Sequence, residues 1–384
     1  MKQVTKAQGK STPAEAEPVA PEGSKCWSIT PKQLDNWLNG IAAVRTLVAP
    51  SQVAGITLYR PVKNAADIVR NYTRPLMSMK DLFFPPTERL FTVHKHGQDV
   101  QLEERLPEGE TVVFGVRPCD ARGTRLLDAM FLDTNPEDPF YARRRQNTTL
   151  IGLACKELGP HCFCTSTGGA PDDPRDMDIM LYPTNEGYLV QAVTEKGRFL
   201  IPGGEWKETG ARQASPVPAS QFPVPARENW PGHFKDEFWA RIGERCLSCR
   251  ACAYVCPTCR CFVVRDEMLE PGEYERIRCW DSCMGENYRR VAGGHKPRNR
   301  KGERQRNRFF CKFYYYPEQY GLGEALHAVG SRRRRRPITI AAALDNHCGV
   351  RRGFLPRGLC NTCPDAARPR DHLRARAGVT QALT

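Results

Sequence analysis

Six of the seventeen cysteines in this chain fall within sixteen residues, in the stretch RCLSCRACAYVCPTCRCF at positions 245–262. Four of them follow the spacing C-x2-C-x2-C-x3-C-P, which is typical of bacterial ferredoxins. Three cysteines at steps of three residues can surround three corners of a cuboidal cluster, whereas the fourth starts a helix that points elsewhere. The spacing therefore predicts a [4Fe–4S] cluster bound by Cys246, Cys249 and Cys252, with Cys256 as the fourth cysteine of the motif.

Zinc is the main alternative to iron and sulfide in this segment, because thiolates also suit zinc. Zinc sites usually use two CxxC pairs separated by a longer loop, so the tighter spacing favours an iron–sulfur cluster. Four more cysteines follow the motif and are either additional ligands or buried thiols that behave as small hydrophobic residues. They are Cys259, Cys261, Cys279 and Cys283.

The rest of the chain is typical of a folded cytoplasmic protein. The first 24 residues are polar and rich in proline and alanine, without the apolar core of a secretory signal, so we expect a disordered arm. No run of 18 apolar residues is present, which argues against a membrane span. Many cysteines without an export signal indicate a reducing compartment, where clustered cysteines are more often metal ligands than disulfides.

The order of the expected elements predicts an α+β fold. Strand patterns at 111–116 and 148–155 flank a helical pattern, which favours an α/β arrangement in the N-terminal half. A ferredoxin-like, mainly helical [4Fe–4S] domain is expected to follow. The expected division is a disordered arm at 1–24, an α/β domain at 25–205, a Pro-rich linker at 206–235, an iron–sulfur domain at 236–321 and an Arg-rich tail at 322–384.

A second group of cysteines lies in the expected α/β domain. Cys119 follows the first of the two strands, and Cys155 ends the second. In a parallel sheet both strand ends lie at the same edge. Cys162 and Cys164 follow in the next loop. These four thiols are candidates for an additional metal centre, with inert buried thiols as the alternative.

Several motifs together resemble one family of iron–sulfur proteins. The motif CxxCxxCxxxCPTCxCF, the later WDSCM and FCKFYYYPEQYG, and the earlier VVFGVRPCDARG and CKELGPHCFCTSTGGAP carry this resemblance. It is to the beta subunits of sulfhydrogenases and the A subunits of anaerobic sulfite reductases, over residues 28–321. It implies an electron-transfer subunit with two [4Fe–4S] clusters. The implied partners are a flavin subunit that takes electrons from NAD(P)H and a catalytic reductase or hydrogenase subunit.

The chain departs from this family after YYYPEQYG. A second CxxCxxCxxxCP motif is implied there, but Ala328, Ser331, Arg334 and Ile338 stand at the four cysteine positions. Without it, the first cluster lacks its fourth ligand and Cys256 lacks a cluster, so either one or two clusters are expected. No lysine follows position 312 and arginine dominates the tail, which is typical of GC-rich codons read out of frame. We therefore expect the tail to be either disordered or out of frame.

The net charge of +14 has two separate sources. From position 326 onward the chain holds 12 arginines against 3 acidic residues, so the tail supplies most of the excess. That distribution argues against a nucleic-acid-binding surface on the folded part. The basic stretch 289–313 is different, since it matches the family. It is either a positive face for a redox partner, a means of raising the cluster potential, or an ordinary solvated helix.

The functional prediction is electron transfer within a cytoplasmic oxidoreductase. No catalytic triad, paired acid and base or phosphate-binding glycine loop is apparent, so we expect no independent chemistry from this chain. Two other functions are open at this point. One is a zinc-stabilised basic binding module, and the other is a subunit that itself reduces sulfur or sulfite.

Overall fold

The computed structural model describes residues 25–159, 162–212, 215–219, 224–288 and 290–320. The expectations for the N-terminal arm and for the Arg-rich tail, including the missing second motif, lie outside the described residues. No helix in the described part combines the length and the apolar character that crossing a bilayer requires.

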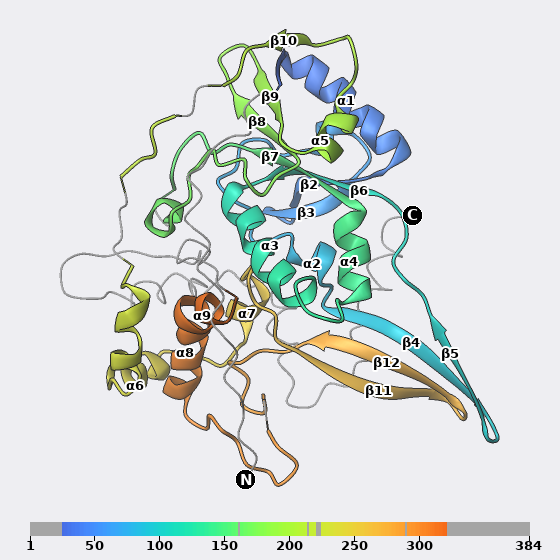
Figure 1. Cartoon of the computed structure of the whole chain (residues 1–384), viewed down its shortest axis with the longest axis vertical. Coiled ribbons are helices and arrows are strands. Elements are labelled where there is room, and N and C mark those ends of the chain that lie inside the picture. The colour runs from blue at the N-terminus through green and yellow to red at the C-terminus, as the bar shows by residue number, and fades with distance from the viewer. Residues whose placement is uncertain (1–24, 160–161, 213–214, 220–223, 289, 321–384) are drawn as a thin grey trace.

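The N-terminal half is built on an eight-stranded mixed sheet (Figure 1). In spatial order its strands are β10 (Lys207–Thr209), β1 (Cys26–Ile29), β9 (Tyr188–Ala192), β8 (Ile179–Pro183), β7 (Thr148–Leu153), β6 (Thr111–Val116), β2 (Thr46–Val53) and β3 (Ile56–Val62). The inner strands β2, β6, β7 and β8 run parallel to one another. Strands β6 and β7 are buried along nearly their whole length, as expected for parallel strands covered on both faces.

Helices cover both faces of this sheet. Helix α1 (Pro31–Val44) begins at a Thr30 capping box with Pro31 in its first turn, and it buries Leu34, Trp37, Leu38 and Ile41 in one core. Helices α3 (Pro118–Phe131) and α4 (Pro139–Gln146) and the short α2 (Lys80–Phe83) bury their apolar residues in a second core on the other face. Helix α5 (Glu195–Leu200) follows β9. These elements confirm the mixed α/β architecture.

A second sheet joins the two halves of the chain. Its order is β11 (Phe262–Glu270), β12 (Glu273–Trp280), β4 (Thr87–His96) and β5 (Asp99–Glu104). Strand β12 of the cysteine-rich half pairs with β4 of the N-terminal half, with His94 opposite Glu273 and Thr87 opposite Cys279. The two hairpins extend side by side as an arm (Figure 1). A mainly helical iron–sulfur segment is therefore not confirmed, since a long hairpin lies within it.

A buried network of charges attaches this sheet to the body of the molecule. Glu88 on β4 forms ion pairs with Arg278 on β12 and with Arg144 on α4. Arg278 also pairs with Asp138, the residue that caps α4. The side chains of Glu88 and Arg278 are only 2% and 3% exposed. Each charge is therefore compensated inside the protein and not by water.

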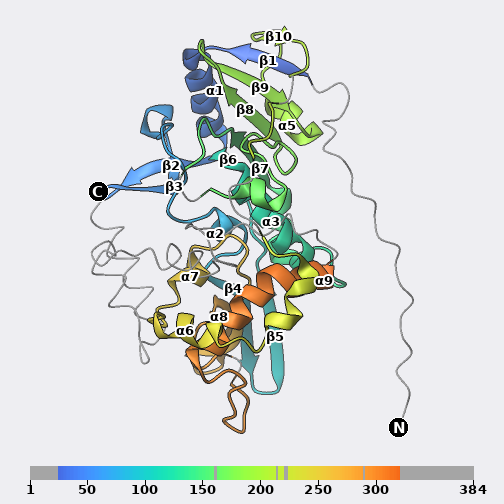
Figure 2. The ribbon, with the colours of Figure 1, turned by 90° about the vertical axis from the view of Figure 1, so that its left-hand side faces the viewer.

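The remaining α-helices belong to the cysteine-rich half of the chain (Figure 2). They are α6 (Phe238–Glu244), α7 (Ala251–Tyr254), α8 (Lys301–Phe310), a π-helical turn (Cys311–Tyr315) and α9 (Tyr316–Tyr320). Helix α6 crosses α8 at two glycines, and a Cβ atom on Gly302 would lie 2.5 Å from the carbonyl oxygen of Trp239. Trp230 of the expected linker packs against Phe310 of α8. Together these contacts fix the position of α8.

Candidate iron–sulfur site

The loop that carries the first three cysteines of the motif has an unusual backbone. Ser248 and Arg250 both adopt left-handed conformations, with φ of 56° and 62°. Such conformations cost roughly 1 kcal/mol or more for residues other than glycine, and they cluster at functional sites. The backbone N–H of Ser248 donates to Cys246 Sγ at 3.3 Å. The loop thus curls tightly enough to place a backbone donor on a motif sulfur.

The first three cysteines form one group, here called the ferredoxin thiols: Cys246, Cys249 and Cys252. Burial raises the pKa of Cys252 to about 11; Arg308 opposes this, and the nearby thiols of Cys259, Cys246 and Cys249 raise it further. Cys246 also packs in a small buried cluster with Cys283 and Met284. The structure therefore brings together the three residues expected to be the first ligands.

Cys256 lies apart from that cluster. It is fully buried and packs with Ala253 and Cys259, and its Sγ lies 3.2 Å from Thr258 Oγ1. A hydrogen bond from the Cys259 thiol holds the pKa of Cys256 well below its usual range, with Lys312 and Arg308 contributing. This separation is the one expected of the fourth cysteine in a ferredoxin motif, which binds the other cluster in two-cluster ferredoxins.

The other four cysteines of the segment divide into three kinds. Cys261 and Cys283 are hydrogen-bonded thiols, and this bond lowers the pKa of Cys261 to about 6 while raising that of Cys283. Cys259 lies between this pair and Cys256, as the mutual effects of these thiols on their pKa values indicate. Cys279 lies on β12, where Arg265 donates to its sulfur at 3.4 Å. Three of the four are therefore near the ferredoxin thiols.

Three buried cations face these sulfurs. Arg308 Nη1 donates to Cys259 Sγ at 3.3 Å, and its Nη2 donates to the Cys252 carbonyl at 2.7 Å. The Nζ atoms of Lys312 and Lys80 donate to the carbonyls of Thr258 and Ala253 at 2.9 and 3.0 Å. The three cations are 2–7% exposed, and none is in an ion pair with a carboxylate in the described part of the chain.

Burying a cation away from water is costly unless an anion or a dense set of acceptors compensates it. A [4Fe–4S] cluster bound by four thiolates is anionic, so it would supply that charge. The residues present therefore fit such a cluster. Arg304, Arg308 and Lys312 of the basic stretch 289–313 are buried. This part of the stretch is therefore not an ordinary solvated helix. Lys80 comes from the other half of the chain, and nothing in the sequence indicated that it would lie beside the motif cysteines.

The second group of cysteines also converges, as the sheet topology predicted. Strands β6 and β7 are parallel neighbours, so Cys119 and Cys155 lie at the same edge. Burial raises the pKa of Cys119 well above its usual range; the Asp120 carboxylate raises it further, as do the thiols of Cys155, Cys164 and Cys162. We call Cys119, Cys155, Cys162 and Cys164 the sheet-edge thiols.

Neither group is arranged for a single metal ion. Among the described residues, no three His, Cys, Asp or Glu side chains lie close enough to one another to bind one ion. A structural zinc site needs four ligands within about 2.3 Å of the metal. A cubane cluster is wider than an ion and carries one thiolate at each iron, so its ligands stand further apart. The preference for a cluster over zinc rests on the sequence spacing of the motif cysteines and on the buried cations beside them.

Comparisons with known proteins agree with this chemistry. Residues 245–336 match the profile of a family described as a 4Fe-4S dicluster domain. The beta subunit of sulfhydrogenase 2 from Pyrococcus furiosus is 30% identical over 296 residues, which cover 73% of this chain and 86% of that protein. No solved structure matches the chain.

Proposed function

The chain belongs to the family of sulfhydrogenase beta subunits, and on that premise we propose that it relays electrons between two other subunits of a cytoplasmic oxidoreductase. One partner binds a flavin and NAD(P)H, and the other is a catalytic reductase or hydrogenase subunit. The motifs predicted both the family and the [4Fe–4S] cofactor, and the comparisons confirm these two predictions. The observation that carries the proposal is the set of buried cations facing the motif cysteines.

The residues that would hold the first cluster are the ferredoxin thiols and one further thiol nearby. The second CxxCxxCxxxCP motif is missing, so its last cysteine cannot complete the ligand set. Cys259, Cys261 and Cys283 are the thiols that lie near enough to replace it. We assign the fourth ligand to one of these three.

When bound, the cluster supplies one-electron transfer, and the protein sets its potential through charge, hydrogen bonds and burial. Arg308 and Lys312 place positive charge beside the sulfurs and so favour the more negative, reduced state. The Ser248 N–H donor on Cys246 acts in the same direction. Burial lowers the pKa of Lys80, and the thiols of Cys259 and Cys256 oppose this. Cys256 is buried and Cys252 is half-buried, which limits screening by water and makes these charges more effective.

Iron and acid-labile sulfide per chain, measured on the anaerobically purified protein, test this function. One cubane cluster contributes about four of each and two contribute about eight. The protein should also be brown and should bleach on reduction. Zinc without sulfide would contradict the proposal. Turnover of sulfite or polysulfide by the isolated chain with a reduced dye would instead show that it is a catalytic subunit.

Replacing Arg308 with methionine should lower the reduction potential of the cluster. The substitution keeps most of the volume of the side chain but removes a buried positive charge that contacts Cys259 and Cys252. With an effective dielectric constant near 20, the expected shift is on the order of 100 mV. A spectroscopic redox titration measures it. Arg306→Met is the matched control, because Arg306 lies on the same helix but contacts Phe234 instead of a cysteine. Equal shifts in both variants would contradict the assignment.

A further inference from the structure

The sheet-edge thiols form a second site that the relay does not use. Cys119 lies in the first turn of α3, directly after β6, and Cys155 follows the end of β7. Cys164 begins a short 3-10 helix in the loop beyond. Each of the six thiol pairs is close enough to interact electrostatically. Three separate segments of the chain therefore bring four thiols to one edge of the large sheet.

Backbone hydrogen bonds hold this loop in place. The N–H of Cys155 donates to the carbonyl of Pro171 at 2.9 Å, and the N–H of Cys162 donates to that of Gly159 at 3.0 Å. The carbonyl of Cys164 accepts from the Gly169 N–H at 2.9 Å and from Thr167 Oγ1 at 3.0 Å. The thiols are thus fixed by an ordered set of turns.

Two buried arginines beside these thiols have donors without an acceptor. Arg117 and Arg122 are 5% and 8% exposed. Each donates to backbone carbonyls, Arg117 to Leu153 and Ala154 and Arg122 to Thr167. However, Arg117 Nε and Arg122 Nη1 are buried without a hydrogen-bond partner. Neither guanidinium is in an ion pair within the described residues. The buried Asp120 carboxylate interacts with Arg117, and the unfilled donors of the two guanidinium groups leave them able to compensate a further anion at the site.

We propose that Cys119, Cys155, Cys162 and Cys164 bind an additional [4Fe–4S] cluster in the α/β domain. Four thiolates are the usual ligand set of such a cluster. Its negative charge would be compensated by Arg117 and Arg122, which approach Cys155 and Cys164.

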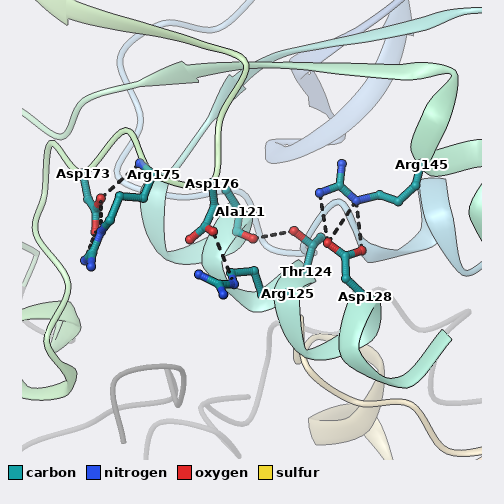
Figure 3. Close-up of polar contacts among 8 residues, drawn as sticks. All are labelled: Ala121, Thr124, Arg125, Asp128, Arg145, Asp173, Arg175 and Asp176. Atoms are coloured by element: carbon teal, nitrogen blue, oxygen red, sulfur yellow. Dashed lines mark hydrogen bonds and ion pairs between the residues drawn. The ribbon is translucent and has the colours of Figure 1, made fainter. Parts of the chain in front are cut away.

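The position of α3 gives this site a role in the relay. A Cβ atom on Gly123 would lie 2.8 Å from Cβ of Pro257, the residue after Cys256. Gly123 is four residues from Cys119, or about 6 Å along a helix. On another part of α3, Arg125 reaches Asp176 at 3.8 Å beside the Asp173–Arg175 pair (Figure 3), which attaches the loop after the thiols to the helix. Helix α3 therefore carries Cys119 in its first turn and, one turn later, packs against the residue that follows Cys256.

The test compares metal content in variants of the full chain purified without oxygen. Cys155→Ala should lower iron and sulfide by about four atoms each. It should also remove one component from the electron paramagnetic resonance spectrum of the reduced protein. Cys249→Ala should remove a different component, and the double variant should lose both. Cys26→Ala is the matched control, because Cys26 is a buried cysteine on β1 outside both groups.

Unchanged iron and sulfide in Cys155→Ala would overturn the proposal, as would zinc in place of iron at this site. Cys162→Ser guards against a folding defect, because Cys162 is half-buried and serine is nearly isosteric. Its loss of the same spectral component, with an unchanged melting temperature, would support the cluster. If iron is instead lost only in Cys249→Ala, the relay function stands and this additional cluster does not.

Discussion

Cys246→Ala should lose one complete cluster, with iron and sulfide falling by about four atoms each per chain. Cys246 is 5% exposed, packs against Cys283 and accepts the Ser248 N–H, so its removal takes a buried, hydrogen-bonded thiolate out of the proposed ligand set. Electron flow from a reduced flavin subunit to the catalytic subunit should stop, because the relay has lost its carrier. Metal analysis and the spectrum of the reduced protein measure the loss directly.

Cys279→Ala is the control for this experiment. Cys279 is also buried and lies in the same segment, but its sulfur faces Arg265 on the neighbouring strand. Its removal should leave iron and sulfide unchanged. Loss of a cluster in Cys279→Ala, or its retention in Cys246→Ala, would contradict the assignment of Cys246 as a ligand and Cys279 as a non-ligand.

Glu88→Ala should destabilise the protein by about 3–5 kcal/mol, the cost of leaving a buried ion without its partner. Arg278 would keep only Asp138, and Arg144 would lose its carboxylate. The substitution would weaken the contacts that hold β4, β12 and α4 together. Chemical denaturation followed by circular dichroism measures the apparent free energy of unfolding.

The matched comparison for Glu88 is Asp266→Ala. Asp266 pairs with Arg276 across β11 and β12, but both side chains are about half exposed. Surface ion pairs of this kind contribute little, because water already compensates the charges. The unfolding midpoint should therefore barely move. A similar loss in both variants would show that burial of the Glu88 network is not what stabilises the arm.

The local elements of the fold could be predicted from the sequence. Thr30 and Pro31 define the start of α1, and apolar residues at helical spacing define its buried face. The strands at 111–116 and 148–153 stand out as apolar runs, and their parallel pairing brings Cys119 and Cys155 together as expected. These features depend on residues close together in the chain or on a simple rule of sheet topology.

The pairing of β4 with β12 could not be predicted in this way. Charged residues occur along both strands, so neither has the apolar pattern of a strand buried on both sides. The pairing depends on residues far apart in the sequence, such as Glu88 and Arg278, which are 190 positions apart. A pattern read along the chain contains no information on which distant charge compensates another.

The chemistry of this protein could be predicted from the cysteine spacing alone. Cys246, Cys249 and Cys252 predict a cubane cluster, because three thiols within seven residues can surround one in a single loop. The surroundings of these thiols emerge only from the folded chain. Arg308, Lys312 and Lys80 are polar residues that local patterns assign to the surface. They are buried because helix packing and the opposite half of the chain enclose them beside the sulfurs, and the cluster that we propose there would offset the cost of their burial.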